Sequence, residues 1–186
     1  MRIVLPLAAV IAALSLSLLA YKEGPLPNMT GGFGDESCHS CHFDNPINAP
    51  GGALVVSGIP KRYKAAQRYV ITVELTRSRL KRGGFEIAAR FQTGPRRGQQ
   101  AGLWRALDRR VQLQASKDGR LQFAQHTTVG TMAQPRGALR WALEWTAPVA
   151  APAPVQFNVA SNASNDDASP LGDFVYVVEI ASVAQR

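Results

Sequence analysis

The sequence predicts an all-β protein, a sandwich of two sheets, on two observations. Apolar residues recur at every second position in the runs Tyr69–Leu75, Phe85–Phe91, Trp141–Trp145 and Phe174–Ile180. This two-residue period is that of a half-buried strand. Turns rich in glycine, proline and asparagine separate the runs, and no sustained helical period follows residue 20. The pattern is typical of an antiparallel sandwich.

Composition indicates one globular domain with a sizeable core. The chain has 186 residues, of which 46% are hydrophobic and 18% charged. With 21 Lys and Arg against 13 Asp and Glu, the formal net charge is 21 − 13 = +8. Two cysteines and three histidines are too few for several metal sites, so any metal chemistry must lie in one place.

Residues 1–20 are typical of an export signal. Arg2 is followed by an unbroken run of apolar and small residues from Ile3 to Ala20, and the chain becomes polar at Tyr21. We expect a periplasmic or extracellular protein in an oxidising compartment. If the segment stays uncleaved, it is just long enough to anchor the domain in a membrane, which is the only membrane contact we expect.

The rest of the chain divides into two parts. Residues 21–52 are rich in Gly, Pro and Asn, a composition that a core helix or central strand does not tolerate, so we expect a loop. Residues 53–184 are expected to form the sandwich. Within it, the short run Leu121–Gln125 resembles a strand whose alternation places His126 opposite Leu121 and Phe123, on the face away from the core.

The chemistry is concentrated in the loop, in the run Cys38-His39-Ser40-Cys41-His42. A C-x-x-C-H run is the attachment signature of c-type haem. Cysteines at this spacing can each form a thioether to one of the two vinyl groups at one edge of the porphyrin. The histidine that follows then serves as the proximal iron ligand. We therefore expect one covalent haem c per chain, held by Cys38 and Cys41 and ligated by His42.

Other interpretations of the cysteines stay open. Cys38 and Cys41 could form a disulfide of the thioredoxin-like redox kind, although that motif belongs at a helix start after a strand. Zinc could be held by both cysteines, His42 and one further ligand. The pair could also be inert.

The second axial position of the iron has few candidates. His39 is pinned inside the motif, which leaves His126 as the candidate distal ligand, with Met29 and Met132 as alternatives. A methionine ligand usually raises the reduction potential relative to histidine, whereas an open position would bind small diatomic ligands. The competing interpretation of His126 is a solvated histidine at a strand end.

The sequence also resembles a known family along almost all of residues 29–183. The resemblance is carried by GGFGDESCHSCH, Gly58–Tyr63, Tyr69–Val73, Gly84–Phe91, Gln125–Thr127, Trp141–Pro148, Val155–Asn165 and Gly172-Asp173. These stretches resemble the reelin-type (Reeler) domain, and more closely the bacterial exported "choice-of-anchor V" subtype with a C-x-x-C-H run. The resemblance implies an immunoglobulin-like two-sheet sandwich preceded by a Gly/Pro-rich loop that carries the motif. It also implies that histidine followed by threonine, as at His126, is a family feature.

Two further clusters of side chains are candidates for binding a ligand or a partner. Oxygen-bearing side chains gather near the last turn, at Asn162, Asn165, Asp166, Asp167 and Asp173. Such a cluster can bind calcium, but Asx-rich turns also arise from local hydrogen bonding alone. Basic residues crowd the middle of the chain, at Arg77, Arg79, Lys81, Arg82, Arg96, Arg97, Arg105, Arg109 and Arg110. They are either a solvated face or a surface that steers an acidic redox partner, and we expect no nucleic acid.

No set of nucleophile, base and orienting group can be assembled from the sequence, so we expect that the protein is not an enzyme. The predicted function is that of an exported monohaem c-type cytochrome-like protein that moves single electrons. The alternative is a non-enzymatic extracytoplasmic binding or adhesion sandwich, in which Cys38 and Cys41 form a disulfide or zinc staple.

Overall fold

The computed structural model of the chain describes residues 21–133, 137–149 and 153–185. The expected export segment, residues 1–20, lies outside the described residues. In the described ranges, no helix is both long and apolar enough to cross a membrane.

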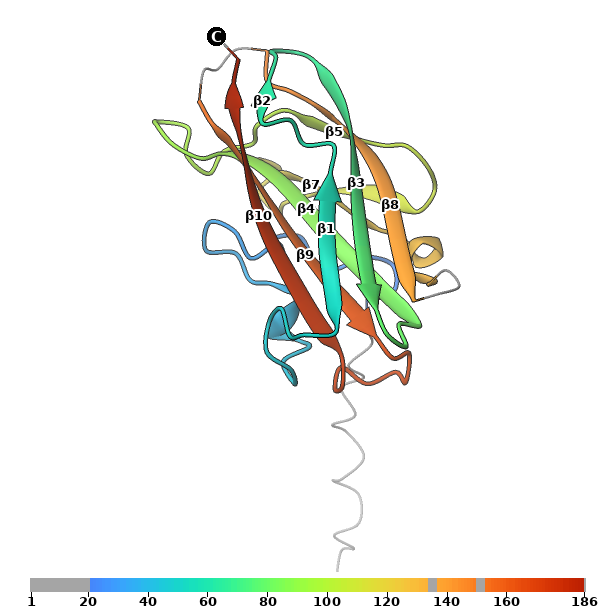
Figure 1. Cartoon of the computed structure of the whole chain (residues 1–186). Helices are drawn as coiled ribbons and strands as arrows, with labels where there is room; N and C mark the ends of the chain where they lie inside the picture. The colour runs from blue at the N-terminus through green and yellow to red at the C-terminus, as the bar shows by residue number, and fades with distance from the viewer. Residues whose placement is uncertain (1–20, 134–136, 150–152, 186) are drawn as a thin grey trace, which may run out of the picture.

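Within the part of the chain that the structure describes, ten strands form two sheets that pack face to face, as the sequence predicts (Figure 1). The four-stranded sheet has the order β1-β3-β8-β5 and consists of β1 (Gly52–Ser57), β3 (Arg68–Arg77), β8 (Ala138–Thr146) and β5 (Leu103–Ala106). The six-stranded sheet has the order β2-β10-β9-β4-β7-β6 and consists of β2 (Arg62–Tyr63), β10 (Phe174–Ala184), β9 (Val155–Ser164), β4 (Arg82–Phe91), β7 (Gln122–His126) and β6 (Val111–Ala115). Two short 3-10 helices complete the elements, η1 (Cys38–Ser40) and η2 (Thr128–Thr131).

The predicted alternation sets the register of the central strands. In the four-stranded sheet, β3 pairs antiparallel with β8, which places Ile71 opposite Leu143 and Val73 opposite Trp141. All four side chains are buried, because they share the face turned toward the other sheet.

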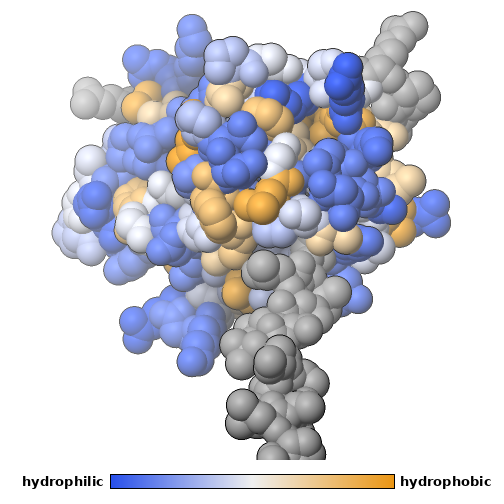
Figure 2. All heavy atoms as spheres, turned by 90° about the horizontal axis from the view of Figure 1, so that it is seen from below, coloured by the Kyte–Doolittle hydropathy of each residue, from blue (hydrophilic) through white to orange (hydrophobic). Residues whose placement is uncertain are grey.

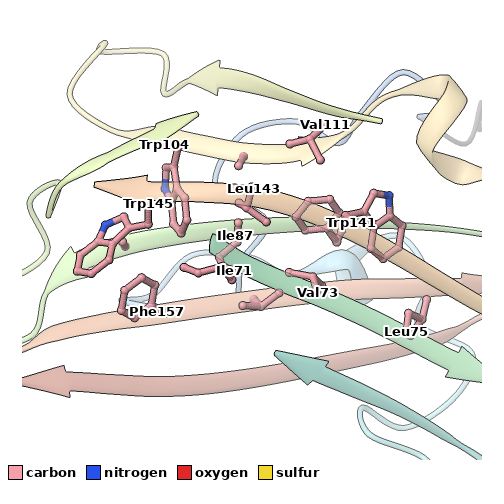
Figure 3. Packing of buried hydrophobic residues seen from close by; sticks show 14 of the residues in the cluster. Ile71, Val73, Leu75, Ile87, Trp104, Val111, Trp141, Leu143, Trp145 and Phe157 are labelled. Atoms are coloured by element: carbon pink, nitrogen blue, oxygen red, sulfur yellow. The ribbon is translucent and has the colours of Figure 1, made fainter. Parts of the chain in front are cut away.

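Aromatic residues fill the space between the sheets (Figure 3). The ring centroid of Trp145 lies 4.8 Å from that of Phe157 and 5.7 Å from that of Tyr63, in edge-to-face arrangements. Its indole N–H donates to the carbonyl of Ala101 at 2.9 Å, so the one polar atom of the side chain is satisfied.

The central strands of the six-stranded sheet are buried on both faces. In β4 every residue after Arg82 is buried, and β9 is buried from Val155 to Ser161. The odd-numbered residues of β4 face the core, as the alternation predicts, whereas the even-numbered Glu86 and Arg90 face outward and are nevertheless buried. A second layer must therefore cover the outer face of this sheet.

Some strands differ from the expectation. The edge strands β5 and β6 were not expected, because four and five residues are too few for a clear alternation. The segment after Val159 was expected to turn at Asn162, but β9 continues to Ser164. Its polar residues stay in the strand because both faces of the sheet are covered.

Trp145→Ala is expected to destabilise the fold by about 3–5 kcal/mol, because it removes a fully buried indole and leaves a cavity. Urea unfolding of both proteins measures the difference. Leu103→Ala is the control, since Leu103 is 64% exposed and its truncation should change stability by no more than about 0.5 kcal/mol. Equal effects of the two substitutions would contradict the packing described here.

Candidate functional site

The N-terminal segment, residues 21–51, supplies the second layer over the six-stranded sheet. The backbone N–H of Met29 donates to the Glu86 carboxylate at 2.6 Å. Asp35 forms an ion pair with Arg90, which is also on β4. At the other edge, Asn48 exchanges side-chain hydrogen bonds with the backbone of Val177 in β10, at 2.9 and 3.2 Å. These contacts fix the loop against the sheet, and with it the motif that the loop carries.

The motif itself forms the helix η1 and the residues that follow it. Ser37 caps η1 by accepting a hydrogen bond from the N–H of His39 at 3.2 Å. The N–H groups of Cys41 and His42 both donate to the carbonyl of Cys38, at 3.3 and 3.0 Å. Residues three apart in a 3-10 turn lie on the same side. The turn therefore presents the two thiols together, with His42 directly after them.

A pocket opens between the motif and the sheet. It is lined by Cys38, Cys41 and His42 from the loop and by His126 from the end of β7, residues that are far apart in the sequence. Its walls are mainly apolar, and the empty space within it, counted out to open solvent, is about 980 Å³.

The rim of the pocket is partly apolar as well. Tyr21 and Leu26 line it and are 57% and 51% exposed. Figure 2 looks at the end of the sandwich that carries the β9–β10 connection, and it shows apolar side chains gathered among hydrophilic ones. A group bound in the pocket would therefore have an accessible edge.

His42 is held by a buried carboxylate. Its Nδ1 lies 2.8 Å from Oδ2 of Asp173, whose side chain is 1% exposed. Asn162 on β9 donates to the same oxygen at 3.0 Å. With Nδ1 engaged, Nε2 is the ring nitrogen left to bind a metal. A hydrogen bond from the second nitrogen to a carboxylate is the usual way in which proteins orient a metal-binding histidine.

The position of His39 agrees with the expectation that it is not a distal ligand. Its Nε2 lies 3.0 Å from the carbonyl oxygen of Asn45, so the loop backbone engages the ring.

His126 lines the pocket, but its placement on the strand differs from the expected one. The sequence placed it away from the core, opposite Phe123. Phe123 in fact lies on the outer face, where the guanidinium of Arg90 is 5.5 Å from its ring centroid, whereas Ala124 belongs to the core. The predicted alternation was therefore wrong, because Phe123 and not Ala124 lies on the outer face. His126 is also buried, which rules out the solvated strand-end histidine.

The imidazole of His126 fills a gap between two strands. β7 pairs with β4 only as far as Gln125 opposite Glu86. At the next position, Nδ1 of His126 accepts from the N–H of Phe85 at 3.1 Å and lies 3.3 Å from the carbonyl oxygen of the same residue. Nε2 lies 3.3 Å from the carbonyl oxygen of Tyr21. Burial lowers the pKa of His126, which favours the neutral imidazole.

Gly84 makes room for that ring. A Cβ at this position would lie 2.2 Å from Cε1 of His126, a distance that no side chain could accept. The ring of His126 occupies the space beside Gly84 where β7 no longer pairs with β4, so a residue without a side chain fits this position.

The two methionines are placed differently. Met29 lines the pocket, so it remains a candidate distal ligand beside His126. Met132 is 55% exposed and does not line the pocket.

The state of the cysteines bears on the alternatives. Both are free thiols. Burial, and after it the charge of Glu86, raise the pKa of Cys38 to about 12. A reactive redox pair needs a lowered pKa, so this environment does not favour thioredoxin-like chemistry. Among the described residues, no group of three or more His, Cys, Asp or Glu side chains is placed to hold a metal ion.

Glu86 is a site residue that the sequence did not reveal. It is fully buried, Oε2 accepts the Met29 N–H, and Oε1 has no partner. Burial raises its pKa to about 8, and the nearby Asp35 acts in the same direction, against Arg90 and the Met29 hydrogen bond. Its one sequence signal is a charged residue inside the run GFEIAARF, with Arg90 on the same face.

The other two clusters are held by contacts of their own. In the proposed calcium cluster, Asp166 pairs with Arg82, Asn165 donates to Asp167, and Asp173 faces His42. Several of the basic residues are also engaged: Arg105 pairs with Glu144, and Arg77 stacks on the ring of Phe174.

Comparisons with known proteins concern the sandwich. No protein-family model matches the chain, and no curated protein sequence matches it. Among solved structures, it is similar to the human F-spondin reeler domain, with 17% identity, a TM-score of 0.46 and coverage of 74% of this chain and 92% of the other. Another structure of the Reelin-N domain of F-spondin has 18% identity, a TM-score of 0.47 and coverage of 76% and 91%. A third, AvmM, which catalyses macrocyclisation in alchivemycin A biosynthesis, has 10% identity, a TM-score of 0.44 and coverage of 74% and 90%.

Glu86→Gln is expected to flatten the pH dependence of stability. The folded protein keeps a proton on Glu86 up to about pH 8, whereas the unfolded chain loses it near pH 4.5. The stabilisation from this proton is fully present below the unfolded value and is lost as the pH rises through the folded one. Its slope is at most about 1.4 kcal/mol per pH unit.

Urea unfolding at a series of pH values measures this slope for the wild type and the variant. Glu179→Gln is the control, because Glu179 is exposed. Parallel curves for the wild type and Glu86→Gln between pH 5 and 8 would contradict the raised pKa of Glu86.

Proposed function

We propose that the protein is an exported, monohaem c-type cytochrome-like electron carrier built on a Reeler-like sandwich of the choice-of-anchor V type. The observation that carries the proposal is the pocket, in which the C-x-x-C-H motif of the loop meets His126 of the sheet. The spacing in the sequence identifies only the residues of the motif. The fold brings a second imidazole, that of His126, to the same pocket.

The residues of the pocket fit a covalently attached haem. Two free thiols lie on one turn, a histidine follows with Nε2 available, and the walls are mainly apolar. Cys38 and Cys41 would hold the group by thioethers, with His42 as proximal and His126 as distal ligand. When bound, haem c supplies a one-electron iron couple.

The protein residues around the pocket support exchange of single electrons. The apolar rim at Tyr21 and Leu26 leaves an edge open to a partner. The net charge of +8 favours a partner with an acidic surface, through an attraction that salt weakens. Export agrees with this chemistry, because c-type haem is attached outside the cytoplasm.

The two tautomers of His126 differ in whether Nε2 is free to bind a metal. With Nδ1 accepting from Phe85 N–H, the proton lies on Nε2; with Nδ1 donating to the Phe85 carbonyl, Nε2 is free. In the second tautomer the ring keeps a hydrogen bond to Phe85, while the Phe85 N–H gives up Nδ1 as its acceptor.

The test of the proposal is cofactor content. The full chain, exported in a host with a c-type haem maturation system, is expected to gain the mass of one haem and to give a thioether-type pyridine haemochrome spectrum. The double variant Cys38→Ser with Cys41→Ser is the control and should carry no covalent haem. A haem-free wild type that is lighter by a pair of hydrogens would indicate a disulfide and favour the binding module instead.

His126→Ala is expected to convert the reduced haem protein from a low-spin to a high-spin optical spectrum, because it removes the distal nitrogen. Met132→Ala is the control, since this side chain is exposed outside the pocket and its loss should leave the spectrum unchanged. An unchanged spectrum of the His126 variant would remove His126 from the coordination shell, and Met29→Leu would then be examined in the same way.

A further inference from the structure

Asp173 has no role in attaching the cofactor, yet it is among the most buried charged side chains of the protein. It directly precedes β10, which fixes its backbone at the end of the sheet next to the motif. Its Oδ2 lies 2.8 Å from His42 Nδ1 and accepts from Asn162 Nδ2 at 3.0 Å, and its Oδ1 accepts from the N–H of Asn165 at 3.3 Å.

Asn162 and Asn165 both donate to it, and the His42 tautomer with its proton on Nδ1 completes a set of three donors around the carboxylate. Among the described residues, His42 is the one charged or chargeable group in an ion pair with Asp173, so no lysine or arginine neutralises it. The negative charge is therefore directed at the imidazole.

We propose that Asp173 is a positioning residue that fixes His42 with its proton on Nδ1 and lowers the reduction potential of the iron that His42 binds. The inference rests on the proposed function. A carboxylate that accepts the Nδ1 proton makes the imidazole a more basic ligand. A more basic ligand and an uncompensated buried negative charge both stabilise ferric over ferrous iron.

Asp173→Asn tests this, because asparagine keeps the shape and one oxygen acceptor but removes the charge. In spectroelectrochemical titration with dithionite and ferricyanide, the variant is expected to have a higher reduction potential than the wild type. We expect a tenfold change in the reduction equilibrium, which is about 59 mV for a one-electron couple. Asp173→Glu, which keeps the charge, should lie closer to the wild type.

Asp167→Asn is the matched control. It makes the same change of charge on the same β9–β10 connection, but Asp167 is exposed and contacts Asn165 and Ser169 rather than His42. Its potential should stay near that of the wild type. An equal shift in both variants, or none in Asp173→Asn, would overturn the proposal, since a merely structural role would lower the yield or stability without moving the potential.

A second measurement uses the wild type and covers the case in which Asp173→Asn does not fold. In proton NMR of the reduced protein with ¹⁵N-labelled histidine, the His42 Nδ1 proton should be present, far downfield and slow to exchange. A His42 Nδ1 proton that exchanges freely with water would contradict the bond to Asp173. A wild type without haem would instead refute the proposed function, and the mass measurement separates the two failures.

Discussion

The outer face of the six-stranded sheet carries polar side chains that are buried, and the site depends on how they are satisfied. Glu86, Arg90 and Asn158 are all less than a tenth exposed. Polar groups in such positions are costly without hydrogen-bond partners. Residues 21–51 provide partners through the Met29 amide and Asp35. Because this segment is held by the needs of the sheet, the cysteines within it are held at a fixed place over β4 and β9.

His126 extends the same principle to the other wall of the pocket. Where β7 parts from β4, the ring takes over hydrogen bonds that the neighbouring strand would otherwise make with Phe85. The backbone of β4 thus orients the imidazole on one side, and Gly84 leaves the space it occupies. A histidine fixed in this way loses little conformational freedom if it binds a ligand.

The sequence predicted those parts of the structure whose signals are local. Phe85, Ile87 and Ala89 revealed their strand, because one face of it packs on the core and repeats every second residue. The edge strands β5 and β6 have only four and five residues, which is too short for a two-residue period to stand out. In β9, Asn162 was interpreted as a turn residue, since no local pattern indicates that a distant loop covers a polar strand face.

The residues of the candidate site also differ in how well local sequence signals identify them. Cys38, Cys41 and His42 are contiguous, so their spacing alone identifies them. His126 was chosen for its residue type, and its predicted orientation was wrong because Phe123 turned out to face the covering loop. Asp173 and Glu86 could not be assigned, because each owes its role to contacts with the N-terminal segment.

The order of the site along the chain has a consequence for its assembly. The motif lies near the N-terminus, whereas Asn162, which lies beside the ring of His42, is 120 residues away, and Asp173 is further still. Since a chain is synthesised from its N-terminus, the two thiols are made well before the strands that complete the pocket. A group that reacts with both cysteines at that stage meets the loop before β9 and β10 are in place.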